Sequence, residues 1–236
     1  MIKKAMILAA GFGKRLHPLT LKYPKPLLKI GNETLLFKTI KLLTKLGIEE
    51  VVINVHYLGD QIINYINNNK FKIKTTLINE KSKILDTGGG VLNAISHFSN
   101  LPFIIINPDT IWSMNYVKEI KKMENFFFNN NKIKCSLLVV RKEKSFDRSL
   151  KTDFILKNNL IKRTQDKNNF EYIYTGLQII KPETFSNIDK KVFSINETWD
   201  KLIENGELYG FESSADFMHV STLKIYQSLE NFLSIR

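Results

Sequence analysis

Three short, almost continuously apolar runs, at residues 5–9, 51–55 and 103–106, constrain the fold more than any other feature of the sequence. Such runs are typical of parallel strands that helices cover on both faces. Three stretches with helical spacing and one more strand lie between them, at residues 34–46, 59–68, 74–79 and 89–96. This alternation predicts an α/β fold with a doubly wound, mostly parallel sheet, whose ligand site opens at the carboxyl ends of the strands.

The second half of the chain alternates less regularly. Its pattern predicts a helix, a strand, a charged loop, a small hairpin, a long strand and a closing helix. These lie at residues 115–128, 133–140, 141–151, 154–157 with 160–164, 172–180 and 222–233. The sequence shows neither an internal repeat nor a linker, so we expect one domain over residues 1–236.

Composition excludes several classes of protein. No apolar run approaches the roughly 20 residues of a membrane-spanning helix, and the N-terminus lacks the pattern of a secretory signal, so we expect a cytoplasmic protein without a membrane partner. The single cysteine, Cys135, excludes an internal disulfide. The formal charge of +12 comes mainly from dispersed lysines, and only five residues are arginine. A nucleic-acid partner is therefore not expected, although the positive field attracts small polyanions.

A glycine loop follows the first predicted strand. Residues 8–16 read LAAGFGKRL, and glycines at such a position let backbone N–H groups approach phosphate oxygens. Leu16 occupies the third glycine position of a dinucleotide fingerprint, and no Gly-Lys-Ser/Thr ending supplies a P-loop. Arg15 and Lys25 add positive charge beside the loop, and Pro24 and Pro26 restrict the backbone around Lys25. A polyphosphate site is favoured over a tight turn with two surface cations.

Two further motifs follow strands of the same predicted sheet. Residues 86–90 read DTGGG, where the glycines either let the backbone pack against a flat base or form a turn that Asp86 or Thr87 caps. Asp109 comes just after the apolar run 103–106, at an edge where a carboxylate can hold Mg²⁺. The alternative for Asp109 is an aspartate that starts a turn.

Together these motifs resemble the sugar-1-phosphate nucleotidyltransferases, from about residue 5 to residue 233 and most densely before Trp112. The segments DTGGG and NPDTIW are similar to those of N-acetylmuramate 1-phosphate uridylyltransferases, although Asp86 stands in for a glutamate and Pro108 for a glycine. The resemblance implies a Rossmann-like nucleotidyltransferase fold with a nucleotide half (about 1–112) and a small sugar-side half (about 113–236).

The resemblance also implies roles for individual residues. Arg15, Lys25 and Asp109 would be catalytic, with Asp109 as a ligand of Mg²⁺. The nucleotide would be bound by Ala10, Gly11, Phe12, Gly13, Lys25, Thr87, Gly88 and Asn107, and the sugar by Asp153, Thr175 and Gly176.

One position departs from the family pattern. The segment FMHVSTL resembles a Trp-x-Asp-Val-Gly-Thr segment whose aspartate is a second ligand of magnesium, and here that position is His219. Mg²⁺ prefers oxygen ligands, so an imidazole would hold it less well, with Mn²⁺ as an alternative ion. The nearest carboxylate, Asp216, lies three residues away and on a strand would point to the opposite face.

The resemblance therefore implies an enzyme that transfers a nucleotidyl group from a nucleoside triphosphate, best matched by UTP, to a sugar 1-phosphate, best matched by N-acetylmuramate 1-phosphate. Pyrophosphate would be released. Alternatives are a guanylyl- or cytidylyltransferase of the same fold that acts on mannose or heptose 1-phosphate or on phosphocholine. A protein that binds nucleotide sugars without catalysis, because of His219, is a further alternative.

Overall fold

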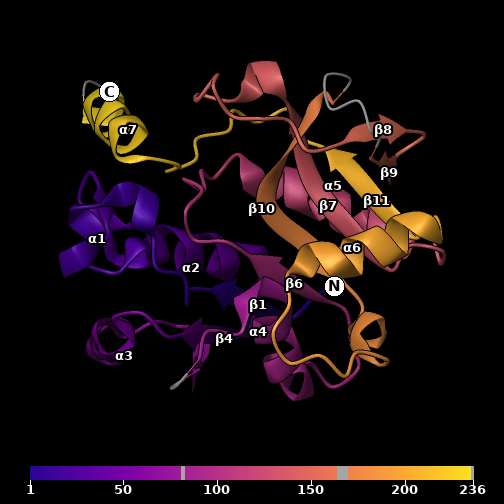
Figure 1. Cartoon of the computed structure of the whole chain (residues 1–236), viewed down its shortest axis with the longest axis horizontal. Coiled ribbons are helices and arrows are strands. Elements are labelled where there is room, and N and C mark those ends of the chain that lie inside the picture. The colour runs from indigo at the N-terminus through magenta and orange to yellow at the C-terminus, as the bar shows by residue number, and fades with distance from the viewer. Residues whose placement is uncertain (81–82, 164–169, 235–236) are drawn as a thin grey trace.

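A computed structural model describes residues 1–80, 83–163 and 170–234 of the chain. Within these residues, nine strands form one sheet in the order β5-β4-β1-β6-β10-β7-β11-β9-β8 (Figure 1). The strands are β1 (Lys4–Leu8), β4 (Glu50–Val55), β5 (Lys74–Asn79), β6 (Phe103–Ile106), β7 (Cys135–Arg141), β8 (Ile155–Lys157), β9 (Leu160–Lys162), β10 (Tyr172–Ile180) and β11 (Leu208–Glu212), while β2 (Lys29–Ile30) and β3 (Glu33–Thr34) form a separate ribbon.

The first half of the sheet is parallel and doubly wound, as the sequence predicts. Strand β1 pairs in parallel with β4 on one side and with β6 on the other. The chain winds outward from β1 to β4 and β5, and then crosses back to β6. The carboxyl ends of β1 and β6 therefore lie side by side where the winding direction reverses, which is where open α/β sheets bind ligands.

The second half of the sheet is mixed. Strand β10 runs antiparallel between β6 and β7, and β11 pairs in parallel with β7. Both β11 and the helix before it were missed in the sequence. In β11 a glycine interrupts the apolar pattern, because a Cβ at Gly210 would lie 2.9 Å from Ile161 Cδ1. The predicted hairpin is present as β8 and β9, and its predicted end at Thr164 lies outside the described residues.

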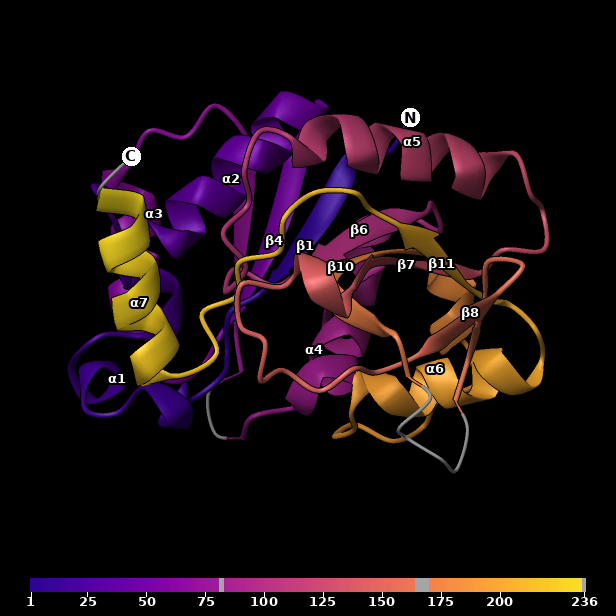
Figure 2. The ribbon, with the colours of Figure 1, turned by 90° about the horizontal axis from the view of Figure 1, so that it is seen from above.

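Helices cover both faces of the sheet. Figure 2 shows α2 and α5 on one side and α4 and α6 on the other. Strand β1 serves both sides, since Ala5 and Ile7 pack in one apolar cluster while Met6 packs in the other. The helices are α1 (Leu19–Lys22), α2 (Leu35–Leu46), α3 (Gly59–Asn68), α4 (Asp86–Ala94), α5 (Tyr116–Phe128), α6 (Ile195–Glu204) and α7 (Leu223–Ser234).

Local sequence explains the bounds of α2. The hydroxyl of Thr34 accepts a hydrogen bond of 3.0 Å from the N–H of Phe37 and so caps the first turn. Gly47 ends the helix in a left-handed conformation with φ of 84°. No helix in the described part of the chain is long and apolar enough to cross a bilayer.

The C-terminal helix supports the loop region of the site. Tyr226 and Leu229 of α7 pack with Leu16 and Leu28 in a third apolar cluster. The Tyr226 hydroxyl also donates a hydrogen bond of 2.7 Å to the carbonyl of Lys29. Residues almost 200 positions apart in the sequence thus hold the segment that contains Arg15 and Lys25, and Figure 2 shows α7 beside α1.

Candidate active site

The glycine loop after β1 turns sharply because of Gly13. This residue has φ of 64°, and the Thr20 hydroxyl donates a hydrogen bond of 2.9 Å to its carbonyl. A Cβ at Gly13 would lie 3.0 Å from Thr20 Cγ2, so the position requires glycine in both conformation and space. At Gly11, in contrast, a Cβ would meet nothing within 4 Å. The open space beside Gly11 faces a cavity.

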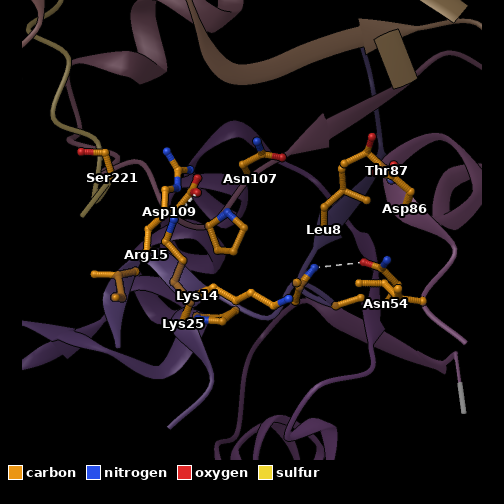
Figure 3. A pocket seen from close by; sticks show the side chains of 18 residues that line it. Leu8, Lys14, Arg15, Lys25, Asn54, Asp86, Thr87, Asn107, Asp109 and Ser221 are labelled. Carbon is orange, nitrogen blue, oxygen red and sulfur yellow. Dashed lines mark hydrogen bonds and ion pairs between the residues drawn. The ribbon is translucent and has the colours of Figure 1, made fainter. Parts of the chain in front are cut away.

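This first cavity, of about 320 Å³, lies at the carboxyl ends of β1 and β6. Figure 3 shows Arg15, Lys25 and Asp109 on one side of it and Leu8, Asp86 and Thr87 on the other. One side is therefore suited to phosphates and the other to an uncharged ring. The lining residues are Leu8, Ala9, Ala10, Gly11, Gly13, Lys14, Arg15, Leu16, Lys25, Pro26, Asn54, Ile84, Asp86, Thr87, Asn107, Pro108, Asp109 and Ser221.

Two side chains, those of Lys25 and His219, converge on one carboxylate oxygen of Asp109. Lys25 Nζ lies 2.6 Å from Asp109 Oδ2, and His219 Nε2 lies 3.1 Å from the same atom. Burial by itself raises the pKa of Asp109. The charges of Lys25 and His219 and their hydrogen bonds lower it by more than burial raises it, so the pKa lies well below its usual range. Asp109 is therefore ionised at neutral pH. An antiparallel bridge between Thr110 and His219 holds His219 close to Asp109.

Asp109 also has an oxygen suited to a metal ion. Its Oδ1 atom is buried and has no hydrogen-bond partner in the described part of the structure. A buried carboxylate oxygen without a partner fits a divalent cation, and Mg²⁺ commonly takes one or two protein carboxylates together with water and substrate phosphates. The described residues contain no group of three or more His, Cys, Asp or Glu side chains that could hold a metal ion.

Asn54 connects the glycine loop to α4. Its Oδ1 accepts a hydrogen bond of 3.0 Å from the N–H of Ala9, and its Nδ2 donates one of 2.7 Å to Glu80 Oε1. The other oxygen of Glu80 accepts from the N–H of Leu85, just before α4. The buried Glu80 thus fixes Asn54 and the start of α4 relative to the end of β1. Sequence reasoning missed this network, because no motif links residues 54 and 80.

The glycines at the start of α4 serve packing within the protein. The N–H groups of Gly88 and Gly89 both donate to the carbonyl of Phe193. A Cβ at Gly88 would lie 2.3 Å from the Phe193 ring, and one at Gly89 would lie 2.2 Å from the carbonyl oxygen of Lys191. Asp86 and Thr87 line the cavity, and the Thr87 hydroxyl also accepts a hydrogen bond of 2.9 Å from the N–H of Ile195.

Two residues predicted to bind the nucleotide do not line this cavity. Gly88 is buried against Phe193, as described above. Phe12 is half exposed, and its ring packs against His56 and Tyr57, with Lys14 Nζ 5.4 Å from its centre. The other residues of that prediction, Ala10, Gly11, Gly13, Lys25, Thr87 and Asn107, all line it.

A second cavity, of about 290 Å³, adjoins the first. Arg15, Asn107 and Asp109 line both. The structure brings all three residues predicted for the sugar into this second cavity, together with His219. Its lining is Arg15, Asn107, Asp109, Thr110, Leu150, Lys151, Asp153, Ile173, Tyr174, Thr175, Gly176, Phe217 and His219.

A bulge in β10 shapes the border between the cavities. The pairing of β10 with β7 shifts register between Tyr174 and Gln178, and Gly176 within the shift has φ of 94°. The carbonyl of Gly176 accepts a hydrogen bond of 2.7 Å from the N–H of Asn107, and a Cβ at Gly176 would lie 3.0 Å from Asn107 Cβ. Gly176 therefore allows close packing of β10 against Asn107. The Thr175 hydroxyl is buried and donates to the carbonyl of Leu138.

Asp153 lines the second cavity and is partly buried. Its Oδ2 accepts a hydrogen bond of 2.9 Å from the N–H of Tyr174. Burial raises the pKa of Asp153, and this effect outweighs the hydrogen bond from Tyr174. Among the residues that the structure describes, none donates a hydrogen bond to its other oxygen, Oδ1, which can accept one from a ligand hydroxyl.

A second acidic residue near His219 was missed in the sequence. Asp147, in the segment predicted as a charged loop, is buried and accepts hydrogen bonds from the hydroxyls of Ser149 and Ser221 at 2.5 and 2.7 Å. Ser221 in turn lines the first cavity. Asp216, in contrast, is exposed and lines neither cavity. Long-range pairing of residues 145–147 with residues 217–221 makes this contact, so no local pattern could reveal it.

The fold and the site define an α/β protein with two adjoining cavities suited to a polyphosphate and a second ligand. The Nucleotidyl transferase family model matches residues 4–147. The chain belongs to this family of enzymes, and the predicted resemblance is confirmed at that level.

Relatives of known activity match most of the chain. It is 26% identical over 221 residues to the N-acetylmuramate alpha-1-phosphate uridylyltransferase of Caulobacter vibrioides, covering 92% of this chain and 91% of that protein. It is 30% identical over 234 residues to the mannose-1-phosphate guanyltransferase of Kluyveromyces lactis, covering 95% of this chain. The chain spans only 63% of the length of that second relative.

Solved structures show the same fold. HddC from Yersinia pseudotuberculosis superposes with a TM-score of 0.76 and 21% sequence identity, covering 98% of this chain and 100% of HddC. A UDP-glucose pyrophosphorylase complexed with UDP-glucose gives a TM-score of 0.76 at 17% identity, with both chains fully covered. The predicted Rossmann-like nucleotidyltransferase fold is therefore confirmed.

Proposed function

We propose that this chain transfers a uridylyl group from UTP to a sugar 1-phosphate, N-acetylmuramate 1-phosphate, and releases pyrophosphate. The observation that carries the proposal is that two cavities share a border formed by Arg15, Asn107 and Asp109. A triphosphate in the first cavity and a sugar phosphate in the second would bring their phosphates together at this border. The relative from Caulobacter vibrioides, matched over nearly its full length, supports this pair of substrates.

The reaction places two polyanions in contact. A phosphate oxygen of the sugar 1-phosphate bonds to the α-phosphorus, and the bond from that phosphorus to the bridging oxygen of pyrophosphate breaks. The attacking oxygen is already ionised at neutral pH, so no side chain has to act as a general base. The protein contributes alignment and positive charge, which are the main requirements of phosphoryl and nucleotidyl transfer.

Arg15 and Lys25 supply the positive charge. Arg15 forms no ion pair or hydrogen bond within the described residues, so its guanidinium is available to phosphate oxygens. Lys25 is paired with Asp109 and is positioned to turn toward a bound triphosphate. Asp109 would hold Mg²⁺, or Mn²⁺, through its unpaired Oδ1. When bound, the ion neutralises charge on the phosphates.

His219 has a place in this arrangement without binding the ion. Its Nε2 faces Asp109 Oδ2, and the pairing fixes one carboxylate oxygen while the other stays available. With a single protein carboxylate at the ion, we expect weak metal binding in the absence of substrate and tighter binding once a triphosphate is present. The cytoplasm, where nucleoside triphosphates are available, is the proposed location.

A grid of four nucleoside triphosphates against several sugar 1-phosphates, scored by pyrophosphate release, tests the proposal. The expected result is turnover with UTP and N-acetylmuramate 1-phosphate that requires Mg²⁺ or Mn²⁺. Binding of both substrates without turnover under either ion would instead support a protein that binds nucleotide sugars without catalysis.

A guanylyltransferase is the second candidate. The guanyltransferase from Kluyveromyces lactis is 30% identical across 95% of this chain. Asp86, which lines the side of the first cavity opposite Arg15 and Lys25, also permits this base, because a carboxylate can accept hydrogen bonds from the two adjacent N–H donors of guanine. Turnover with GTP and mannose 1-phosphate, exceeding that with UTP, would select this candidate.

A further inference from the structure

We propose that Lys151 recognises a carboxylate on the sugar, so that the second cavity selects sugar 1-phosphates with an acidic substituent. This inference rests on the proposed function and narrows its substrate class. It starts from the distribution of charge between the two cavities. Arg15 lines both cavities, whereas Lys151 lines only the second. Lys151 therefore lies on the sugar side of the reaction centre.

The ammonium group of Lys151 is uncommitted. Among the residues that the structure describes, Lys151 has neither an ion pair nor a hydrogen bond to its side chain. The acidic residues of the same cavity, in contrast, have partners within the protein. Asp109 pairs with Lys25 and His219, and Asp153 accepts a hydrogen bond from the N–H of Tyr174. An unpaired cation at a ligand cavity is available to an anionic group of the ligand.

The backbone around Lys151 is fixed on both sides. Leu150 packs against the buried cluster of Val140, Ile173 and Phe217. Asp153 donates a backbone hydrogen bond of 2.7 Å to the carbonyl of Tyr172. The side chain of Lys151 therefore starts from a defined point at the edge of the cavity, although the residue itself is exposed.

Lys151 and Asp153 divide the recognition of one sugar between them. In an extended segment residues i and i+2 point to the same side, and both of these residues line the cavity while Thr152 does not. The partly buried Asp153 accepts hydrogen bonds from sugar hydroxyls, and the exposed Lys151 at the rim donates to a carboxylate that projects from the ring. A neutral sugar such as mannose would leave the ammonium without a partner.

The test compares two sugars that differ by a single acidic group. N-acetylmuramate 1-phosphate carries a lactyl carboxylate that N-acetylglucosamine 1-phosphate lacks, and kcat/KM is measured for each with the same nucleoside triphosphate. In the wild type the acidic sugar is preferred. Lys151→Ala lowers the ratio of the two kcat/KM values about tenfold, as expected for loss of one charge-assisted hydrogen bond. Lys151→Arg retains the preference, and Lys151→Glu reverses it.

The matched control is Lys157→Ala, which removes an exposed lysine that lines neither cavity and leaves the ratio unchanged. An equal loss for both sugars in Lys151→Ala would mean that Lys151 contacts the shared phosphate, and this would overturn the proposal. An unchanged ratio would overturn it as well.

A failure of the proposed function gives a different result. If the wild type releases no pyrophosphate with either sugar, the dissociation constants of the two sugar phosphates are measured by calorimetry on the same variants. Tighter binding of the acidic sugar that Lys151→Ala abolishes would support the recognition of a carboxylate in a protein without turnover. Equal binding of both sugars would overturn it.

Discussion

The two cavities adjoin one another but are built from different kinds of segment. The first lies where the parallel strands β1 and β6 end, so the loop after each strand delivers its residues directly. The second is formed by a bulge in β10 and by two segments, 150–153 and 217–219. Long-range bridges hold these segments in place, from Phe154 to Tyr172 and from Phe217 to Ser145. The parallel half of the fold thus builds the cavity proposed for phosphates from local sequence, and the mixed half builds the cavity proposed for the sugar from distant segments.

The reaction that we propose takes place at the border between the two cavities. Arg15 lies in the loop after a parallel strand, whereas Gly176 and His219 belong to the segments of the mixed half. Asp109 lies between these two groups. Variants can therefore be sorted by whether they affect both cavities or only one.

Asp109→Asn should have the largest effect on activity, because Asp109 lines both cavities at their shared border. The substitution keeps the shape of the side chain but removes the charge that pairs with Lys25 and His219 and the proposed metal ligand. We expect pyrophosphate release to fall about a thousandfold or more. Circular dichroism checks that the fold is retained, and Asp60→Asn, at an exposed position in α3, is the control. Unchanged pyrophosphate release would refute the role of Asp109.

Arg15→Ala is expected to have the next largest effect. Because Arg15 lines both cavities, its loss should raise KM for the nucleoside triphosphate and for the sugar phosphate, and lower kcat/KM about a hundredfold. The neighbouring Lys14→Ala is the matched comparison, since Lys14 lines only the first cavity, and it should raise KM for the triphosphate alone. A change in only one KM for Arg15→Ala would contradict a shared border.

The same contrast explains what the sequence could predict. The parallel strands and the loops after them were predicted closely, because a buried run followed by glycines or by an aspartate is a local pattern. Strand β6 was predicted with its observed bounds, and Asp109 was found from its place just after it. Arg15 and Lys25 were predicted to lie beside the same loop, and the structure places both in the first cavity with Asp109.

The remaining features depend on tertiary contacts. The glycines of DTGGG were interpreted as a surface for a base or a turn, but the structure packs Gly88 and Gly89 against the segment 191–193, which lies more than 100 residues later. Asp147 and Ser221 form a hydrogen bond across 74 positions. Neither contact has a signal within a window of local sequence, because the partners meet only after the sheet has formed.

Asp153→Asn tests the second cavity alone, because Asp153 lines that cavity and not the first. Asparagine keeps an oxygen that can accept from Tyr174 N–H but loses the charge, so KM for the sugar phosphate should rise about tenfold while KM for the triphosphate stays constant. The control is Asp189→Asn, which lies outside both cavities. A rise in KM for the triphosphate would place Asp153 at the nucleotide instead.

The same variant should gain stability at neutral pH. Because burial raises the pKa of Asp153 in the folded chain, the folded state binds this proton more tightly than the unfolded state does. The associated stability is present below the unfolded-state pKa, about 3.9, and is lost as pH rises through the higher folded-state pKa. Asparagine does not titrate, so the unfolding free energy of Asp153→Asn should exceed that of the wild type near neutral pH, and the difference should vanish on acidification. Denaturation by urea at several pH values measures it.

A pair of glycine variants tests the first cavity alone and has the smallest effect on activity. At Gly11 a Cβ would meet nothing in the protein, so Gly11→Ala should change the unfolding free energy by no more than about 0.5 kcal/mol. Its methyl group would project toward the ligand, and KM for the triphosphate should rise about threefold, equivalent to weakening one backbone hydrogen bond. Gly89→Ala should lower the unfolding free energy and leave KM for the triphosphate unchanged. Its Cβ would lie 2.2 Å from the carbonyl oxygen of Lys191, and overpacking costs about 2 kcal/mol. Each substitution adds the same methyl group at a different surface. Loss of stability in Gly11→Ala with none in Gly89→Ala would therefore contradict the assignment of Gly11 to the ligand and of Gly89 to packing.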